Sequence, residues 1–218
     1  MNIETEIFNR YSASQKQLLN YGFIPLDNSY YFEKNILDNS FKIVVEYKDN
    51  TINAKVIDLA FNDEYINFRN DTIGEFNHQI KTILIDLLLD IRDKCFKEEP
   101  FIYPQTNFIN NYLVSTFSNH IFPFTKHPNF AVYKKGNKWF VTINDIPLNK
   151  LTNNSDNKII EAMNIKINPN NRHELLKIDG IYPAYHMNKN HWLSVTLDNR
   201  ISNSELIKLI NQSYELVK

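Results

Sequence analysis

The 218-residue sequence has little cysteine, little glycine and no long hydrophobic run. Its single cysteine, Cys95, allows no intrachain disulfide, which fits a protein of the reducing cytoplasm. We expect Cys95 to be a buried packing residue of a helix and not a nucleophile. The four glycines form neither a GxGxxG turn nor a Walker A loop, so the common nucleotide-binding folds are not supported. No apolar run approaches the roughly 18 residues of a membrane span, and the acidic start of the chain is unlike a signal peptide.

Charge is distributed unevenly along the chain, although the formal net charge is only −1. Residues 1–100 contain 11 Lys and Arg against 17 Asp and Glu, a net charge of −6. Residues 101–218 contain 13 against 8, a net charge of +5. This asymmetry predicts an acidic N-terminal domain at residues 1–97 and a second domain at 106–218, with different partners. Residues 98–105 are the expected linker, because two prolines and a charge cluster interrupt the helical pattern there.

The first domain is predicted to be a sheet of three or four strands with helices on one face. Apolar residues at helical spacing predict one helix over Ile3–Tyr21, which Gly22 would terminate. Strands are predicted at Tyr30–Ile36, Phe41–Tyr47 and Thr51–Leu59, with a short fourth strand within Glu64–Arg69. The capping box Thr72-x-x-Glu75 predicts the start of a long helix that continues to about Phe96.

The second domain is predicted to have the order α-β-β-β-α-β-β-α. Helices are expected at Thr106–Asn119, at Asn168–Leu176 and from the capping box Ser202-x-x-Glu205 onward. Strands are expected at Phe130–Lys134, at Lys138–Asn144, within Lys158–Asn168 and in a hairpin over Ile181–Leu197. Both domains are therefore predicted to be layered α+β structures, each an antiparallel sheet with helices packed on one face.

The densest group of candidate binding residues is IYPAYHMNKNHW at residues 181–192. We interpret this stretch as a hairpin whose tip is residues 187–190, with His186 and His191 facing each other at the strand ends. Trp192 would pack behind the tip as a half-buried aromatic residue. Pro183 predicts an edge strand or a bulge, and an edge strand could pair with a strand of another chain.

This stretch, followed by a strand and a terminal helix ending in SYELVK, resembles the MmcQ/YjbR family. The resemblance extends over about residues 104–218 and includes FTKHPNFAVYKKGNK at residues 124–138, which is similar to the first hairpin of the family. It implies a small α/β domain that is described as a double-wing DNA-binding domain.

Two basic-tipped hairpins on one sheet would form two wings that contact nucleic acid. The candidate contacts to phosphates, base edges and unpaired bases are Lys134, Lys135, Lys138, Tyr185, His186, Asn188, Lys189, His191 and Trp192. Lysines at hairpin tips can also serve solubility alone and block edge pairing. The leading hypothesis is a non-catalytic DNA-binding protein. The alternative is a protein- or peptide-interaction module that uses the sheet edge and the acidic first domain, with no nucleic-acid role.

We expect no metal site, no cofactor and no enzyme active site. Two imidazoles are too few for a structural zinc site, and the spacing does not fix a third ligand such as His173 or Asp179. Either histidine of the hairpin could act as a general base, with Lys189 or Tyr185 stabilising an anion. No nucleophile or carboxylate pair accompanies them, so structural roles for the histidines are the simpler interpretation.

Overall fold

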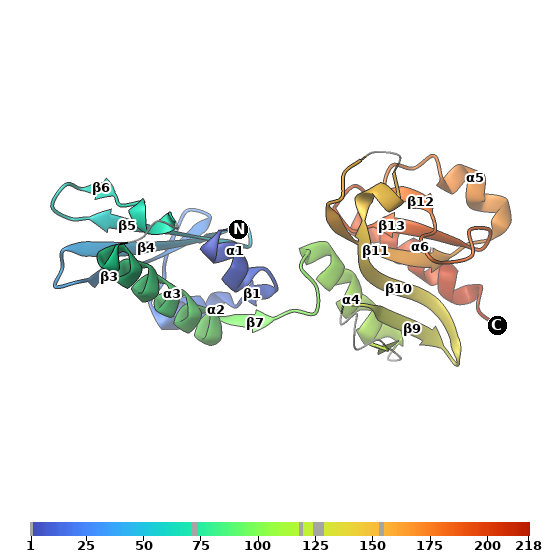
Figure 1. The fold of residues 1–218 in the computed structure, drawn as a ribbon. Coiled ribbons are helices and arrows are strands. Elements are labelled where there is room, and N and C mark those ends of the chain that lie inside the picture. The colour runs from blue at the N-terminus through green and yellow to red at the C-terminus, as the bar shows by residue number, and fades with distance from the viewer. Residues whose placement is uncertain (1, 71–73, 118–119, 124–128, 153–154) are drawn as a thin grey trace. The chain divides into compact units, whose positions relative to one another are not determined.

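The computed structural model describes residues 2–70, 74–117, 120–123, 129–152 and 155–218. The chain divides into two compact units, Met1–Glu99 and Pro100–Lys218, and this boundary falls inside the stretch expected to be a linker. Both units are α+β with antiparallel sheets, as predicted, and each sheet has its own helices (Figure 1). In the described part of the chain, no helix is both long and apolar enough to cross a membrane.

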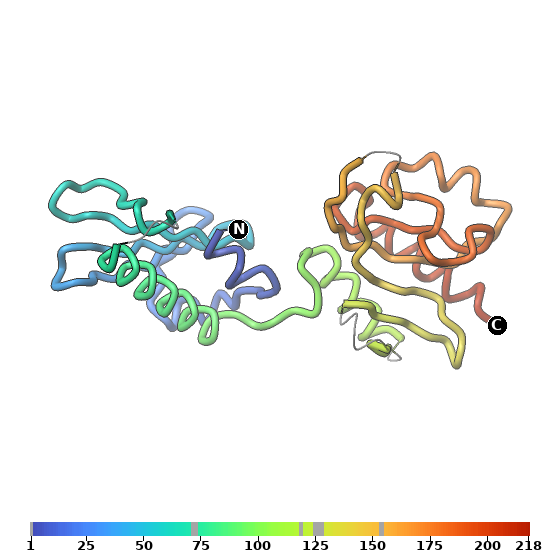
Figure 2. The backbone as a smooth tube through the Cα atoms, viewed as in Figure 1, coloured from blue at the N-terminus to red at the C-terminus, as the bar shows by residue number. Residues whose placement is uncertain are grey.

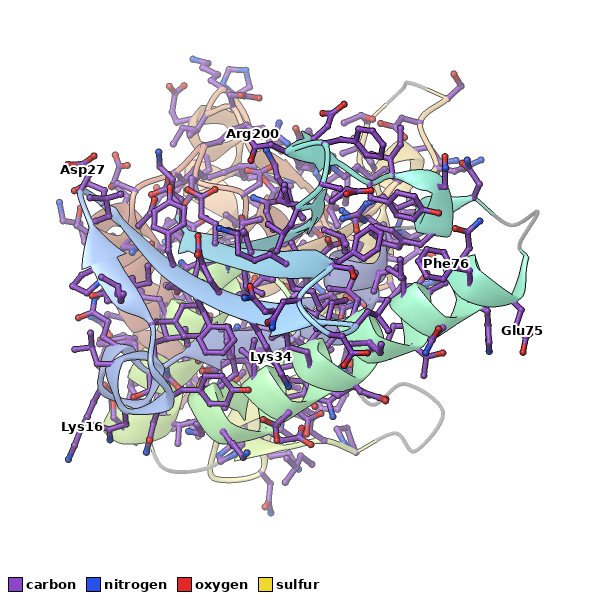
Figure 3. All side chains as sticks on the ribbon, turned by 90° about the vertical axis from the view of Figure 1, so that its left-hand side faces the viewer. Lys16, Asp27, Lys34, Glu75, Phe76 and Arg200 are labelled. Carbon is purple, nitrogen blue, oxygen red and sulfur yellow. The ribbon has the colours of Figure 1, made fainter. Side chains whose placement is uncertain are left out.

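The first unit contains a five-stranded antiparallel sheet in the order β2-β3-β4-β5-β6 and a separate pair of strands, β1 and β7. Its elements are α1 (Ile3–Phe8), β1 (Tyr11–Ala13), α2 (Gln15–Tyr21), β2 (Ile24–Leu26), β3 (Ser29–Ile36), β4 (Phe41–Lys48), β5 (Thr51–Asp58), β6 (Asp63–Glu64), η1 (Asn67–Arg69), α3 (Glu75–Cys95) and β7 (Phe96–Glu98). Figure 3 turns this unit toward the viewer, with Glu75 and Phe76 labelled in the first turn of α3. The three main strands and the long helix are as predicted, whereas Thr72 of the predicted capping box lies outside the described residues.

One face of this sheet packs against α3, because apolar residues alternate along its strands. Ile43 and Val45 on β4 and Val56 on β5 are fully buried, and so is Leu84 on α3. Cys95 belongs to the same core, as expected for a packing residue. Burial raises the pKa of the Cys95 thiol to about 11, so the thiol stays protonated at neutral pH.

The N-terminal segment is not the single helix that was predicted for Ile3–Tyr21. Tyr11–Ala13 forms strand β1, which separates α1 from α2 and pairs with Phe96–Glu98. Helical periodicity reports only on neighbours along the chain, so it could not show this pairing with a distant segment. Gly22 does terminate α2, with a φ of 113° in the left-handed region.

Two short strands of this unit also differ from expectation. The fourth strand predicted within Glu64–Arg69 is only Asp63–Glu64, and the chain continues as the 3-10 helix η1. Strand β2, Ile24–Leu26, was not predicted, because three residues around a proline show too little alternation.

A buried ion pair closes the β5 edge of the first sheet. The Glu4 side chain is only 3% exposed, and its Oε1 atom lies 2.7 Å from Nη2 of Arg69. The Ala54 amide donates to Glu4 Oε1 at 3.3 Å, and the Ala54 carbonyl accepts from Arg69 Nη2 at 2.6 Å. Two side chains thus take the place of a neighbouring strand at a position that β6 does not reach.

The second unit is built on a six-stranded antiparallel sheet in the order β12-β13-β11-β10-β9-β8. Its elements are α4 (Pro104–Phe117), β8 (His120–Ile121), β9 (Ala131–Lys135), β10 (Lys138–Pro147), η2 (Leu148–Lys150), β11 (Ile159–Lys166), η3 (Pro169–Asn171), α5 (Arg172–Leu175), β12 (Ile181–Pro183), β13 (Trp192–Thr196) and α6 (Asn203–Glu215). The predicted order is confirmed, with β8 as an addition. Of the hairpin expected at residues 124–138, residues 124–128 lie outside the described part, as do residues 118–119 of the predicted first helix.

Helices α4 and α6 cover one face of this sheet. Ile109 and Leu113 of α4 and Leu206 and Ile210 of α6 are fully buried in the same core as the strand residues. The capping box of Ser202 is confirmed at the start of α6. The Ser202 hydroxyl accepts from the Glu205 amide, and the Glu205 carboxylate accepts from the Ser202 amide. Within the residues that the structure describes, no long helix packs on the opposite face, and we call it the helix-free face.

Candidate nucleic-acid interface

The register of the second sheet places both candidate hairpin turns at the same end of the sheet. Lys138 at the start of β10 lies opposite Lys135 at the end of β9. Lys166 at the end of β11 lies opposite Trp192 at the start of β13. Because neighbouring strands are antiparallel, the β9–β10 turn and the β12–β13 loop both leave the sheet at this end. The yellow bend in Figure 2 is the β9–β10 turn.

Two of the lysines at the β9–β10 turn contact the C-terminal segment of the chain. Lys135 Nζ donates to the Tyr214 carbonyl at 3.3 Å and lies 4.3 Å from the centre of the Tyr214 ring. Lys138 Nζ donates to the Lys218 carbonyl at 3.2 Å. Both ammonium groups therefore have a structural partner, although they still add positive charge to this end of the sheet.

Lys134 points to the other face of the sheet, since successive strand residues alternate. It lies opposite Trp139 of β10, which is half-buried. Within the described parts of the chain, the Lys134 ammonium has no hydrogen-bond or ion-pair partner. Of the three lysines at this turn, Lys134 is the one whose charge is free for a ligand.

The β12–β13 loop is longer than the four-residue tip that was predicted. Strand β12 ends at Pro183, so the loop extends over residues 184–191 and His186 does not lie at a strand end. Pairing stops with Pro183 opposite Leu193, and beyond it the Tyr185 amide donates to the Ser194 hydroxyl at 3.0 Å. This bond to a side chain follows the last backbone pairing of the ladder, and Tyr185 packs against the buried cluster of Ile146, Ile160 and Ala162. The edge position predicted from Pro183 is confirmed, because β12 is the first strand in the sheet order.

Hydrogen bonds within the β12–β13 loop fix its far half. Asn188 Oδ1 accepts from the Asn190 amide at 3.0 Å, and the Asn188 carbonyl accepts from the His191 amide at 3.0 Å. Arg172 Nε donates to the Lys189 carbonyl at 2.9 Å. Asn188 therefore has a local role in the turn. The exposed Lys189 ammonium has no partner within the described residues.

The two histidines of the loop are both exposed, and the His186 ring centroid lies 3.9 Å from that of Tyr185. Among the residues that the structure describes, no group of three or more His, Cys, Asp or Glu side chains could hold a metal ion. The candidates for a third ligand have other contacts, since His173 lies 3.1 Å from Glu174 and Asp179 lies 3.4 Å from Arg200.

Trp192 does not lie open beside the tip. It is only 7% exposed, and Lys166 Nζ lies 5.0 Å from the centre of its ring. A base could not stack on this ring without displacing Lys166, so Trp192 supports the loop from beneath. The half-buried Trp139 is the more accessible indole at this end. Sequence reasoning did not select Lys166 or Arg172, because their positions follow from strand register and loop contacts and not from the hairpin pattern.

A buried polar network on the helix-free face holds the base of the loop. The Ser194 hydroxyl donates to Asn164 Oδ1 at 2.5 Å, and Asn164 Nδ2 donates to Thr142 Oγ1 at 3.1 Å. Asn164 and Ser194 lie opposite each other on β11 and β13. Because the same hydroxyl accepts the Tyr185 amide, the network links three strands to the start of the loop.

A buried carboxylate joins the former linker stretch to the sheet. Glu161 of β11 is 2% exposed and accepts from the amides of Ile102 at 2.6 Å and Tyr103 at 2.9 Å, just before α4. Burial raises the pKa of this carboxyl above its ordinary value, and Asp145 on the neighbouring strand adds to the rise. Residues 101–105 are thus a structural part of the second unit.

The second unit is an α+β domain of antiparallel strands that presents two loops at one end. The YjbR family model matches residues 117–216. YyaQ of Bacillus subtilis, an uncharacterized protein, is 32% identical over 99 residues, which are 44% of this chain and 83% of that protein. YbdF of Escherichia coli, also uncharacterized, is 34% identical over 90 residues, 41% of this chain and 66% of that protein. The chain belongs to the YjbR family, and the first unit is additional to the matched region.

A solved structure is similar to about half of the chain. The crystal structure of a protein from Pseudomonas syringae is 34% identical, with a TM-score of 0.49, and the match covers 53% of this chain and all of that one.

Proposed function

We propose that the second unit binds DNA at the end of its sheet where the β9–β10 turn and the β12–β13 loop project. The observation that carries this proposal is the strand register, which brings two loops far apart in sequence to one end of one sheet. A surface with two projecting loops can contact phosphates at two places along a duplex.

The lysines at this end support the proposal through their free charge. Lys134 on one loop and Lys189 on the other have no ion-pair partner within the described residues, so neither would have to give up a contact to meet a phosphate. Lys135 and Lys138 add charge from their positions against the C-terminal segment. About four phosphate contacts would give weak and strongly salt-dependent binding.

The test is fluorescence anisotropy of a labelled duplex with the full chain at low salt. The variant Lys134→Ala/Lys189→Ala should bind about tenfold more weakly, because it loses two phosphate contacts. The matched control Lys16→Ala/Lys208→Ala loses the same charge at two exposed positions outside the proposed surface; Lys16 is labelled in Figure 3. Equal losses in both variants would mean that net charge alone drives binding, and no binding by the wild-type chain would reject the proposal.

A second candidate function, protein interaction, is favoured by one observation in the first unit. Edge strand β2 exposes two apolar side chains, Ile24 at 69% and Leu26 at 60%, whereas Glu4 and Arg69 close the opposite edge at Ala54. An open apolar edge can accept a strand from another protein. Pull-down of partners with wild-type protein and with an Ile24→Lys/Leu26→Lys variant tests this function, since partners of this edge should be lost from the variant.

A further inference from the structure

A pocket lies between η2 and the β12–β13 loop. It has a volume of about 520 Å³, and its lining includes Lys150, Thr152, Tyr185, His186 and Lys189. This volume is in the range of small-molecule sites, roughly 300–1,000 Å³. No acidic residue is among the lining residues that the structure describes. The pocket therefore combines room for a small ligand with a one-sided positive charge.

Two lysines from different elements supply this charge. Lys150 ends η2, and Lys189 lies in the far half of the β12–β13 loop. Their ammonium groups have no ion-pair or hydrogen-bond partner in the part of the chain that the structure describes, and the Lys189 backbone is held by Arg172. Two unpaired lysines in the lining of one cavity favour the binding of a phosphate group there.

Two planar side chains line the same pocket. The Tyr185 and His186 rings have centroids 3.9 Å apart and planes inclined by 49°. Tyr185 packs on the apolar cluster of the helix-free face, and its backbone amide donates to the Ser194 hydroxyl. These contacts hold Tyr185 in place beside His186. His186 has a φ of 57°, a left-handed conformation that costs free energy for a residue other than glycine. The residue with this strained backbone therefore also lines the pocket.

We propose that this pocket binds a mononucleotide unit, with its phosphate on Lys150 and Lys189 and its planar base against Tyr185 and His186. Aromatic groups contact the faces of bases without regard to their identity, so the site recognises the class and not one base. This inference goes beyond the proposed DNA surface, because Lys150 follows the end of β10 whereas the β9–β10 turn precedes its start.

The test is calorimetric titration of the full chain with adenosine 5′-monophosphate, ribose 5-phosphate and adenosine. The mononucleotide should bind at least about tenfold more tightly than either part, because only it engages both halves of the pocket. Lys150→Ala should weaken its binding by about tenfold, whereas the matched variant Lys208→Ala should leave it unchanged. Lys150 and Lys208 are both exposed, so neither change should prevent folding.

Three results would overturn the inference: no heat at about 5 mM mononucleotide, equal affinity for ribose 5-phosphate, or an unchanged affinity in Lys150→Ala. Repeating the titration with a single-stranded pentanucleotide shows whether the bound nucleotide is free or part of a nucleic-acid strand. If the pentanucleotide binds more tightly than the mononucleotide, the pocket binds a strand; if it binds more weakly, the pocket binds the free nucleotide. Failure of mononucleotide binding in the pocket can be distinguished from failure of duplex binding at the two loops. Lys150→Ala should keep duplex binding, and Lys134→Ala should keep mononucleotide binding.

Discussion

The ammonium group of Lys135 lies 4.3 Å from the centre of the Tyr214 ring and 3.3 Å from the Tyr214 carbonyl oxygen. The β9–β10 turn is thereby attached to the last turn of α6, on the helix-covered face of the sheet. Its neighbour Lys134 points to the helix-free face and has no ion-pair partner within the described residues. Two adjacent lysines, equivalent in the sequence pattern, thus have different surroundings.

We predict that Lys135→Ala lowers the free energy of unfolding of the second unit by about 1 kcal/mol, because a charge-assisted bond and a cation–π contact are lost. Lys134→Ala should change it by no more than about 0.5 kcal/mol. Urea unfolding followed by tryptophan fluorescence measures this unit selectively, since both tryptophans, Trp139 and Trp192, belong to it. Equal effects of the two substitutions would contradict the separate roles.

Removal of the Glu161 carboxylate should destabilise the second unit strongly. Glu161→Ala leaves the amides of Ile102 and Tyr103 without their acceptor in a buried place, which should cost about 2–3 kcal/mol. The same fluorescence-detected unfolding measures the loss. A cost below about 0.5 kcal/mol would show that water replaces the carboxylate without difficulty.

The raised pKa of Glu161 predicts a specific pH dependence. The folded protein holds this proton more tightly than the unfolded chain does, because burial penalises the charged form. Its contribution to stability is therefore fully present below the ordinary value of 4.5 and is lost as the pH rises through the higher folded-state pKa. The free energy of unfolding of the wild type minus that of Glu161→Gln should fall as the pH rises above the ordinary value of 4.5. A difference that stays flat as the pH rises through and above this value would contradict the assignment.

The ion pair at the β5 edge gives a prediction for the first unit. Arg69→Ala leaves the Glu4 carboxylate buried without its partner and should destabilise the unit by about 2–3 kcal/mol. The double variant Glu4→Gln/Arg69→Ala should recover part of this loss, because the unpaired charge is gone. Far-UV circular dichroism during urea unfolding reports on both units, and this unit has no tryptophan, so the first unit is measured by the change in dichroism that tryptophan fluorescence does not follow. A double variant less stable than Arg69→Ala would contradict the role of the unpaired charge.

The sequence was sufficient for elements whose pattern is local. Alternation of Ile52, Ala54 and Val56 predicted strand β5, and the capping box at Ser202 predicted the start of α6, because each depends on residues a few positions apart. The split of Ile3–Tyr21 could not be predicted in this way, since strand β1 forms only by pairing with β7 at the far end of the unit.

The candidate site was predictable as a group of residues but not as a geometry. The sequence pattern selected the β9–β10 turn and the β12–β13 loop, and the strand register places both at one end of the sheet. It could not show that Lys166 covers Trp192, because that contact depends on the register between β11 and β13. Nor could it show that Lys150 lines a pocket with His186, since η2 and the loop are far apart in the sequence.

The most direct test of the central claim is the salt dependence of duplex binding by the full chain. A protein that contacts about four phosphates should show log K falling against log salt with a slope of about −3.6. In Lys134→Ala/Lys189→Ala the slope should become shallower by about 1.8, whereas it should not change in Lys150→Ala. A wild-type slope near zero, or the same slope in the double variant, would contradict DNA binding through the two loops.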